Sequence, residues 1–271
     1  NHFTENNIMN KIKSLLGFAA LTVASVSFTA QANETITIGA TPVPHVEILE
    51  VVKPILAKEG FDLKITEFND YVQPNLAVAD GQLDCNFFQH LPYLESFVKE
   101  RGSDLVNVGG IHIEPMGVYS RKIKDLKDLK DRATVAIPND PTNGGRALLL
   151  LQSAGLITLE DPKSVTSTPL DIKENKKNLN FKELEAPQLP RSLDDTDISI
   201  INTNYAIGAG LNPLKDALFI EKSDSPYVNI VVANSKTAKS EGVQALVKAL
   251  KSPKVKKFIL DKYKGAVVPA F

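Results

Sequence analysis

Short β-like runs alternate along this chain with longer segments whose apolar residues recur at helical spacing. Residues 35–40 alternate as a strand does, and apolar residues three or four positions apart follow in residues 45–56. The same order continues through residues 62–68, 71–80, 83–88, 90–101 and 105–113. This order predicts a parallel or mixed sheet with helices on its faces, and therefore an α/β fold.

A second unit of the same kind follows a densely charged segment. Residues 121–132 interleave Asp with Lys and Arg, which we interpret as a solvated helix face at a domain boundary. Beyond it we predict strands at 134–138, 178–185, 198–202 and 228–233, and helices from 144 to about 154 and at 187–192, 205–210, 240–250 and 255–263.

The last two predicted helices would overcrowd the second unit, so we expect the chain to return to the first. Lobe 1 would comprise residues 33–117 with 233–271, and lobe 2 residues 118–232. Two crossings, near Met116–Ser120 and Val231–Asn234, would then form a hinge. Ligands of such folds bind at strand ends and between domains, so we expect a ligand cleft between the lobes.

The N-terminal segment has the pattern of a secretory signal peptide. Residues 1–8 precede a methionine and are interpreted as a reading-frame scar. Two lysines, an apolar run at 15–28 and the small-residue site Ala30-Gln31-Ala32 predict cleavage after Ala32. The run falls short of the roughly 20 residues of a membrane-spanning helix. No cysteine follows it at the cleavage site, so we expect a periplasmic protein without a lipid anchor.

The composition gives no support for binding to nucleic acid or an anionic membrane, and it excludes an internal disulfide. A formal net charge of −1 gives no electrostatic case for binding nucleic acid or an anionic membrane. Cys85 is the only cysteine, so an internal disulfide is excluded. The protein is expected to be a monomer.

The stretch Thr134–Leu151 is the strongest site candidate. We predict a strand, a polar turn at 139–143 and a helix that opens at Gly144, which puts Arg146 in the first helical turn. An arginine there opposes the helix dipole, an arrangement that makes sense if an anion is bound between them. The alternative is an arginine that pairs with a neighbouring acid or lies in solvent.

Two more strand-to-helix junctions carry polar and aromatic side chains. Residues 86–93 place Phe88, His90 and Tyr93 at one junction, and Tyr71 opens the preceding helix, so these four could form an aromatic wall. Phe87 should face the opposite side of its strand and join the core. At residues 201–206, either Asn202 or Asn204 could cap a helix while the other meets a ligand. Asn229 lies in an apolar strand, where a buried amide needs partners.

Catalytic and metal signatures are absent from the sequence. No nucleophile elbow, zinc-protease motif, cysteine pair or phosphate loop is present. Cys85 could be a nucleophile, but a cysteine in a strand is more often a small buried apolar residue. The histidines at 45, 90 and 112 are far apart in sequence, which argues against a metal site. We therefore predict no enzyme activity, cofactor or metal.

Several long segments resemble one family: the methionine-binding NlpA/MetQ group of periplasmic substrate-binding proteins from bacterial ABC importers. The matching segments are residues 71–76, 86–94, 143–148, 185–193, 201–206 and 224–229, and the resemblance spans residues 34–271. It implies a type II-like, two-lobed binding protein that closes on one amino acid and delivers it to a membrane permease with its ATPase subunits.

The resemblance also implies roles for individual residues. Arg146 would hold the ligand carboxylate, and Asn204 and Asn229 its amino and carboxylate groups. Tyr71, Phe88, His90 and Tyr93 would surround the thioether, and Asn143 is a further, weaker match. The expected ligand is L-methionine. The alternatives are a methionine-containing dipeptide, another apolar amino acid, or a different class of protein, an exported hydrolase or a surface interaction protein.

Overall fold

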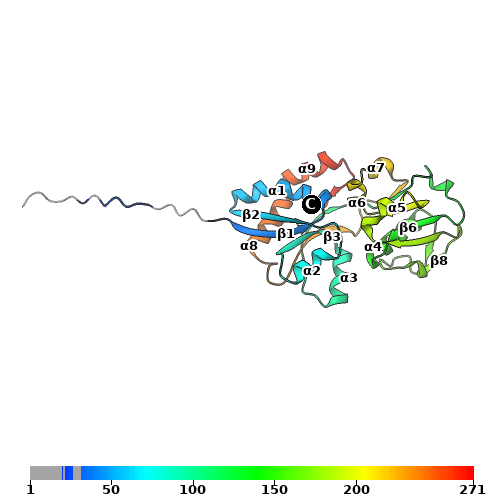
Figure 1. Ribbon diagram of the computed structural model, residues 1–271, viewed down its shortest axis with the longest axis horizontal. Coiled ribbons are helices and arrows are strands. Elements are labelled where there is room, and N and C mark those ends of the chain that lie inside the picture. The colour runs from blue at the N-terminus through cyan, green and yellow to red at the C-terminus, as the bar shows by residue number, and fades with distance from the viewer. Residues whose placement is uncertain (1–19, 21, 27–31) are drawn as a thin grey trace, which may run out of the picture. The chain divides into compact units, whose positions relative to one another are not determined.

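The computed structural model describes residues 20, 22–26 and 32–271, and Asn33–Phe271 forms one folded unit with two large sheets and a two-stranded one (Figure 1). Most of the predicted signal peptide lies outside the described residues. No helix in the described part of the chain is long and apolar enough to cross a membrane.

The first sheet has the strand order β13-β4-β12-β3-β1-β2. Strands β1 (Glu34–Ala40), β2 (Phe61–Glu67) and β3 (Cys85–His90) run parallel, whereas β12 (Val228–Ala233) is antiparallel to both β3 and β4 (Val106–Ile113). The short strand β13 (Val268–Pro269) pairs with β4 at the edge. A mixed sheet of this kind is the predicted class.

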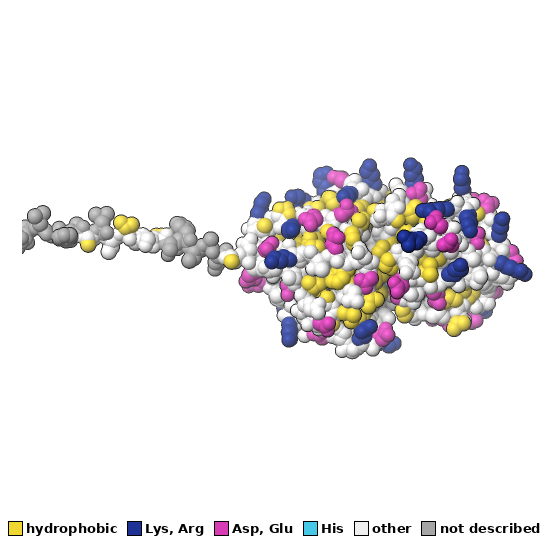
Figure 2. Space-filling model, viewed as in Figure 1, with side chains coloured by type: hydrophobic (Ala, Val, Ile, Leu, Met, Phe, Trp, Pro, Cys, Tyr) yellow, Lys and Arg dark blue, Asp and Glu magenta, His cyan; other side chains and the backbone are white. Residues whose placement is uncertain are grey.

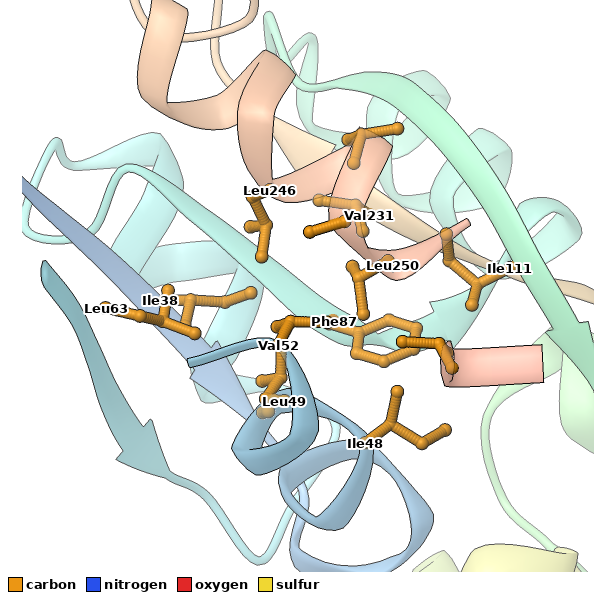
Figure 3. Close-up of a cluster of buried hydrophobic side chains, with 14 of the residues drawn as sticks. Ile38, Ile48, Leu49, Val52, Leu63, Phe87, Ile111, Val231, Leu246 and Leu250 are labelled. Carbon is orange, nitrogen blue, oxygen red and sulfur yellow. The ribbon is translucent and has the colours of Figure 1, made fainter. Parts of the chain in front are cut away.

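Helices cover both faces of the first sheet. On one face lie α1 (Glu47–Lys58), α8 (Glu241–Leu250) and α9 (Pro253–Tyr263), and on the other α2 (Gln73–Ala79) and α3 (Leu91–Arg101) (Figure 1). Figure 3 shows Leu49 and Val52 of α1 and Leu250 of α8 packed around Phe87. Along β12, Val231 joins this core while Ile230 and Val232 face the helices opposite, because successive strand residues point to opposite faces.

The second sheet has the order β11-β5-β10-β6-β9. Its strands are β5 (Gly117–Tyr119), β6 (Thr134–Pro138), β9 (Asn180–Leu184), β10 (Ile198–Ile201) and β11 (Phe219–Ile220). Helix α4 (Pro141–Ser153) covers one face, and α5 (Leu189–Ser192) and α6 (Thr203–Gly208) cover the other. The remaining elements are α7 (Pro213–Asp216) and a hairpin of β7 (Thr158–Leu159) and β8 (Ile172–Glu174).

Two short segments connect the lobes and lie side by side. Residues 114–116 lead from β4 to β5, and residues 221–227 lead from β11 to β12. Between them, the backbone N–H of Glu221 donates to the carbonyl oxygen of Met116 over 2.8 Å. We expected the return to lobe 1 near Val231–Asn234, and that expectation was wrong. It occurs before Val228, because all of β12 is already paired within the first sheet.

Two local predictions also differ from the structure. Residues 121–132 form bends with one 3-10 turn at Leu126–Asp128, not a helix, although most of them are exposed as expected. Helix α2 begins at Gln73 rather than at Tyr71. Its start is fixed by Asp70, whose carboxylate accepts the backbone N–H groups of Val72 and Gln73 over 2.9 Å each.

The folded unit carries an even mixture of charges on the face seen in Figure 2, where acidic and basic side chains are interspersed. That distribution agrees with the formal net charge of −1. Steering by a field of one sign is therefore not expected at this face.

Candidate functional site

A pocket between the lobes collects all eight predicted site residues. It contains about 330 Å³ of space not filled by protein atoms, part of which is open solvent. Its walls come from both lobes and from the first connecting segment. They include Tyr71, Phe88, His90, Tyr93, Asn143, Arg146, Asn204 and Asn229. They also include Asn202, which the sequence left open as the alternative to Asn204, and Gln89, Glu114 and Thr203, which sequence reasoning did not propose as ligand contacts.

Arg146 lies in the second turn of α4, not the first. Asp140 caps the helix by accepting the backbone N–H of Asn143 over 3.0 Å, and Pro141 occupies the first helical position. The predicted turn at residues 139–143 is thus the start of the helix itself. The adjacent Gly145 allows close packing, since a Cβ there would lie 2.3 Å from the carbonyl oxygen of Val165.

The guanidinium of Arg146 joins both connecting segments. Its Nε donates to Oε2 of Glu221 over 2.9 Å, and its Nη2 donates to Oε1 of Glu221 over 2.6 Å and to the backbone oxygen of Glu114 over 2.9 Å. The ring of Tyr227 lies under it, 4.2 Å from Cζ. Burial alone would lower the pKa of Arg146, but Glu221 outweighs that effect and raises it. Arg146 is therefore a buried cation with a resident partner.

Tyr71, Phe88 and Tyr93 form an aromatic wall on the side of the first lobe. The ring centroids of Phe88 and Tyr93 are 5.8 Å apart at an interplanar angle of 80°, and those of Tyr71 and Phe88 are 5.9 Å apart. The hydroxyl of Tyr93 donates to the backbone oxygen of Tyr71 over 2.7 Å, which holds the wall together. Phe87 lies in the core of the first lobe, as predicted from strand alternation.

His90 connects the lobes and stays neutral. Its Nδ1 accepts the backbone N–H of Tyr93 over 3.1 Å, so Nε2 carries the proton that is donated to Oδ1 of Asn143 over 2.7 Å. Burial, together with the positive charge of Arg146, lowers the pKa of His90 to about 3. The expected titratable nitrogen of this wall is therefore uncharged at ordinary pH.

Two further hydrogen bonds tie the lobes together around the pocket. The hydroxyl of Tyr71 donates to Oδ1 of Asn204, and that of Tyr205 donates to the backbone oxygen of Asn69 over 2.8 Å. Together with the bond between His90 and Asn143, they hold the cleft in a closed arrangement.

Two further residues present hydrogen-bond acceptors to the pocket: Asn202, which the sequence left open as a ligand contact, and Glu114, which sequence reasoning missed. Asn202 donates through Nδ2 to Oδ1 of Asn143 over 3.1 Å, and its own Oδ1 is buried without a hydrogen-bond partner. We expected Asn202 or Asn204 to cap α6, but neither side chain does so. Glu114 is 5% exposed, and only its Oε2 appears in hydrogen bonds among the described residues.

Several polar atoms that line the pocket make no hydrogen bond within the described residues, and we call these atoms open. The open donors and the open acceptors lie on different residues. Oδ1 of Asn204 accepts from Tyr71 and Oδ1 of Asn229 accepts from His45, whereas Nδ2 of each amide makes no hydrogen bond within the described residues. Nη1 of Arg146 likewise makes no hydrogen bond within the described part of the chain. The open donors are therefore Arg146, Asn204 and Asn229, and the open acceptors are Glu114 and Asn202.

The fold brings together two histidines whose separation in sequence was our argument against a metal site. His45 and His112 are far apart in sequence, yet their ring nitrogens lie with a Glu114 oxygen within 4.8 Å of one another. In the observed arrangement Nε2 of His112 is 2.7 Å from Oε2 of Glu114. Tetrahedral zinc with bonds of about 2.1 Å would separate two ligands by roughly 3.4 Å. The geometry here is that of a hydrogen bond.

Cys85 is fully buried in the core of the first lobe, away from the pocket. Burial raises the pKa of its thiol, chiefly by removing water from the thiolate. The interpretation of Cys85 as a small buried residue is confirmed.

Comparison with known proteins identifies the family of the chain. Residues 36–271 match the model of the NlpA lipoprotein family. The chain belongs to the NlpA lipoprotein family. Curated relatives include the D-methionine-binding lipoprotein MetQ of Salmonella typhi, 50% identical over 82% of this chain and 83% of that protein, and MetQ of Escherichia coli, 47% identical over 82% of this chain and 83% of that protein.

Solved structures of NlpA-like proteins share the fold. A nutrient-binding protein from Burkholderia cenocepacia bound to methionine is 49% identical, with a TM-score of 0.85 over 87% of this chain and 100% of that one. An ABC transporter periplasmic substrate-binding protein from Coxiella burnetii is 43% identical, with a TM-score of 0.83 over 87% of this chain and 100% of that one. The predicted two-lobed α/β fold is confirmed.

Proposed function

We propose that this chain is the substrate-binding component of an ABC importer, which captures methionine in the periplasm and delivers it to a membrane permease and its ATPase subunits. The observation that carries this proposal is that the open donors and the open acceptors of the pocket lie on different residues. A free amino acid presents one carboxylate and one ammonium group. Burial of either charge is costly unless it is paired.

The donors match the carboxylate and the acceptors match the ammonium. Nη1 of Arg146 with the amide nitrogens of Asn204 and Asn229 would bind the carboxylate, and Glu114 with Oδ1 of Asn202 would accept from the ammonium. The orphaned oxygen of Asn202 supports this assignment, because a buried polar atom without a partner destabilises the ligand-free protein.

The aromatic wall supports a thioether side chain. Sulfur–aromatic contacts contribute about 0.3–1.5 kcal/mol each. The names of the curated relatives specify D-methionine, whereas we expected the L-form, so the two enantiomers must be compared directly.

The test is a ligand survey of protein purified without refolding. We expect mass spectrometry to find co-purified methionine. Calorimetric titration of the emptied protein should rank a methionine enantiomer above alanine and above glycyl-methionine. A dipeptide that binds more tightly than either enantiomer would replace methionine as the ligand, and hydrolysis of the dipeptide would replace the binding function itself.

Location is a separate part of the proposal. We propose cleavage after the small-residue site Ala30-Gln31-Ala32, which gives a mature N-terminus at Asn33. We propose that this N-terminus carries no lipid anchor, because residue 33 is not a cysteine. The relatives are named lipoproteins, which makes this the point on which the chain would differ from them. N-terminal sequencing of the protein from the periplasm tests it, and a mature chain that retains residues 15–28 would contradict it.

A further inference from the structure

Two buried histidines beside the pocket have no part in the proposed ligand contacts. His45 lies in the helical turn Pro42–Val46 before α1 and is 1% exposed, and His112 lies near the end of β4 and is 0% exposed. Neither residue lines the pocket, yet each contacts a residue that does.

The neighbours of His45 determine where its proton lies. Nε2 is 2.8 Å from Oδ1 of Asn229 and 3.2 Å from Oε2 of Glu114, both of which are acceptors. Nε2 must therefore carry the proton and donate. Nδ1, 2.9 Å from Oγ1 of Thr41, accepts the hydroxyl proton in the neutral ring.

This hydrogen bond orients the amide of Asn229. Because Oδ1 is held toward His45, Nδ2 is the end of the amide that is left without a partner and can donate to a ligand. Without His45, the amide could rotate and present an acceptor instead, since its two ends differ only in hydrogen-bonding type.

The two histidines also keep the Glu114 carboxylate charged. Oε2 accepts from Nε2 of His112 over 2.7 Å as well as from His45, while Nδ1 of His112 is buried without a partner and has no acceptor for a second proton. Burial would raise the pKa of Glu114, but His45 and His112 outweigh it and hold that pKa well below its usual range.

We propose that His45 is a positioning residue that sets the polarity of the pocket, by turning the amide of Asn229 donor-first toward the ligand carboxylate and by supporting the Glu114 carboxylate that receives the ammonium. This inference rests on the proposed function and extends it to a residue outside the pocket wall. A residue that only filled space would not distinguish a ligand carboxylate from a ligand amide, which provides the test.

The experiment compares methionine with methioninamide, whose amide replaces the carboxylate. Calorimetric titration of His45→Leu should show methionine binding weakened about tenfold to a hundredfold, in line with the penalty for a misdirected buried polar group. Methioninamide should lose less than about threefold, because a rotated Asn229 can accept from it. His45→Gln keeps an N–H donor near the position of Nε2 and should restore the wild-type ratio of the two affinities.

Val46→Ala serves as the matched control, because Val46 lies on the same turn and packs into the core. It should lower the melting temperature and leave the affinity ratio unchanged. Equal losses for both ligands in His45→Leu, or a His45→Gln variant that behaves like His45→Leu, would overturn the proposal.

A second readout does not depend on methionine. Nitrogen-15 NMR of the ligand-free protein, with the His45 signal assigned from its loss in His45→Gln, should show the neutral form protonated at Nε2. A proton on Nδ1 would overturn the positioning role. If wild-type protein bound no methionine but His45 were protonated at Nε2, the proposed ligand would be wrong and the orientation of Asn229 would stand.

Discussion

Arg146 and Glu221 form a two-point ion pair, with Nε and Nη2 of the arginine 2.9 and 2.6 Å from the two carboxylate oxygens. The arginine proposed to bind the ligand carboxylate thus already holds a carboxylate from the segment that connects the lobes. Of its guanidinium nitrogens, only Nη1 makes no hydrogen bond within the described residues. A ligand carboxylate would therefore be a second anion bound to an arginine that is already paired.

Arg146→Ala should therefore affect both binding and stability. Truncation of one side of a buried charge pair costs about 2–5 kcal/mol of binding, or roughly 30-fold to several thousand-fold in methionine affinity. The pair with Glu221 also predicts that the free energy of unfolding of the ligand-free protein falls by about 3–5 kcal/mol, because a buried carboxylate is left unpaired. Calorimetric titration and denaturant unfolding measure the two effects.

Glu221→Gln is the matched control for Arg146→Ala, since it weakens the same pair and leaves the arginine in place. It should lower stability and retain most of the methionine affinity, and Arg146→Lys should recover only part of the binding because a lysine cannot make the forked contact. Wild-type affinity in Arg146→Ala would mean that the carboxylate is held elsewhere.

Glu114→Gln should weaken methionine binding and reverse the preference between methionine and its analogue without the amino group. The charge of Glu114 is proposed to pair with the ammonium, so its removal should cost methionine about 2–5 kcal/mol. The analogue is an anion and should bind the neutral variant more tightly than the wild type. Competition titration of the two ligands measures the preference, and an unchanged ratio would remove Glu114 from the ammonium site.

Tyr93→Ala should reduce selectivity for the side chain. Loss of the ring removes part of the wall around the proposed thioether, so methionine should lose more affinity than alanine does. Tyr93→Phe keeps the ring and removes only the hydrogen bond to the backbone of Tyr71. It should bind methionine nearly as wild type, and equal losses for methionine and alanine in Tyr93→Ala would place Tyr93 outside the side-chain pocket.

His90 should make the protein less stable in mild acid. Its pKa is about 3 in the folded protein, against about 6.5 for an unperturbed histidine, so the unfolded state binds the proton more readily. The contribution of His90 to the free energy of unfolding is complete above about pH 6.5. It is lost as the pH falls toward 3, by up to about 1.4 kcal/mol per pH unit. In urea unfolding between about pH 4 and 6, the free energy of unfolding of His90→Gln should depend on pH with a slope smaller by up to one proton than that of the wild type.

The elements were predictable because their signals are local. The spacing of apolar residues in a helix or strand predicts which side chains are buried. The structure places Leu250, Phe87 and Val231 in the core of the first lobe. Sheet membership is not local. Val228–Ala233 is an apolar strand that would suit either lobe, and only its pairing with β3 and β4 assigns it to the first.

The candidate site was predictable where residues follow strand ends in recognisable segments, as His90 and Asn204 do. Glu114 was missed, although an acidic residue directly after a predicted strand and before Pro115 is a signal that could have been used. Asp140-Pro141 was interpreted as a turn, whereas a capping acid followed by proline is also a common helix start. The meeting of His45 with His112 depends on the assembled sheet and has no sequence signal.

The position of β12 in the middle of the first sheet has a consequence for the order of synthesis. The second sheet uses only strands within residues 117–220, so it can be completed while residues 221–271 are still to be made. The first sheet must wait, because β3 and β4 meet only through β12, and α8 and α9 come later still. The strands β1 to β4 are therefore synthesised first, yet the sheet that they belong to is completed last.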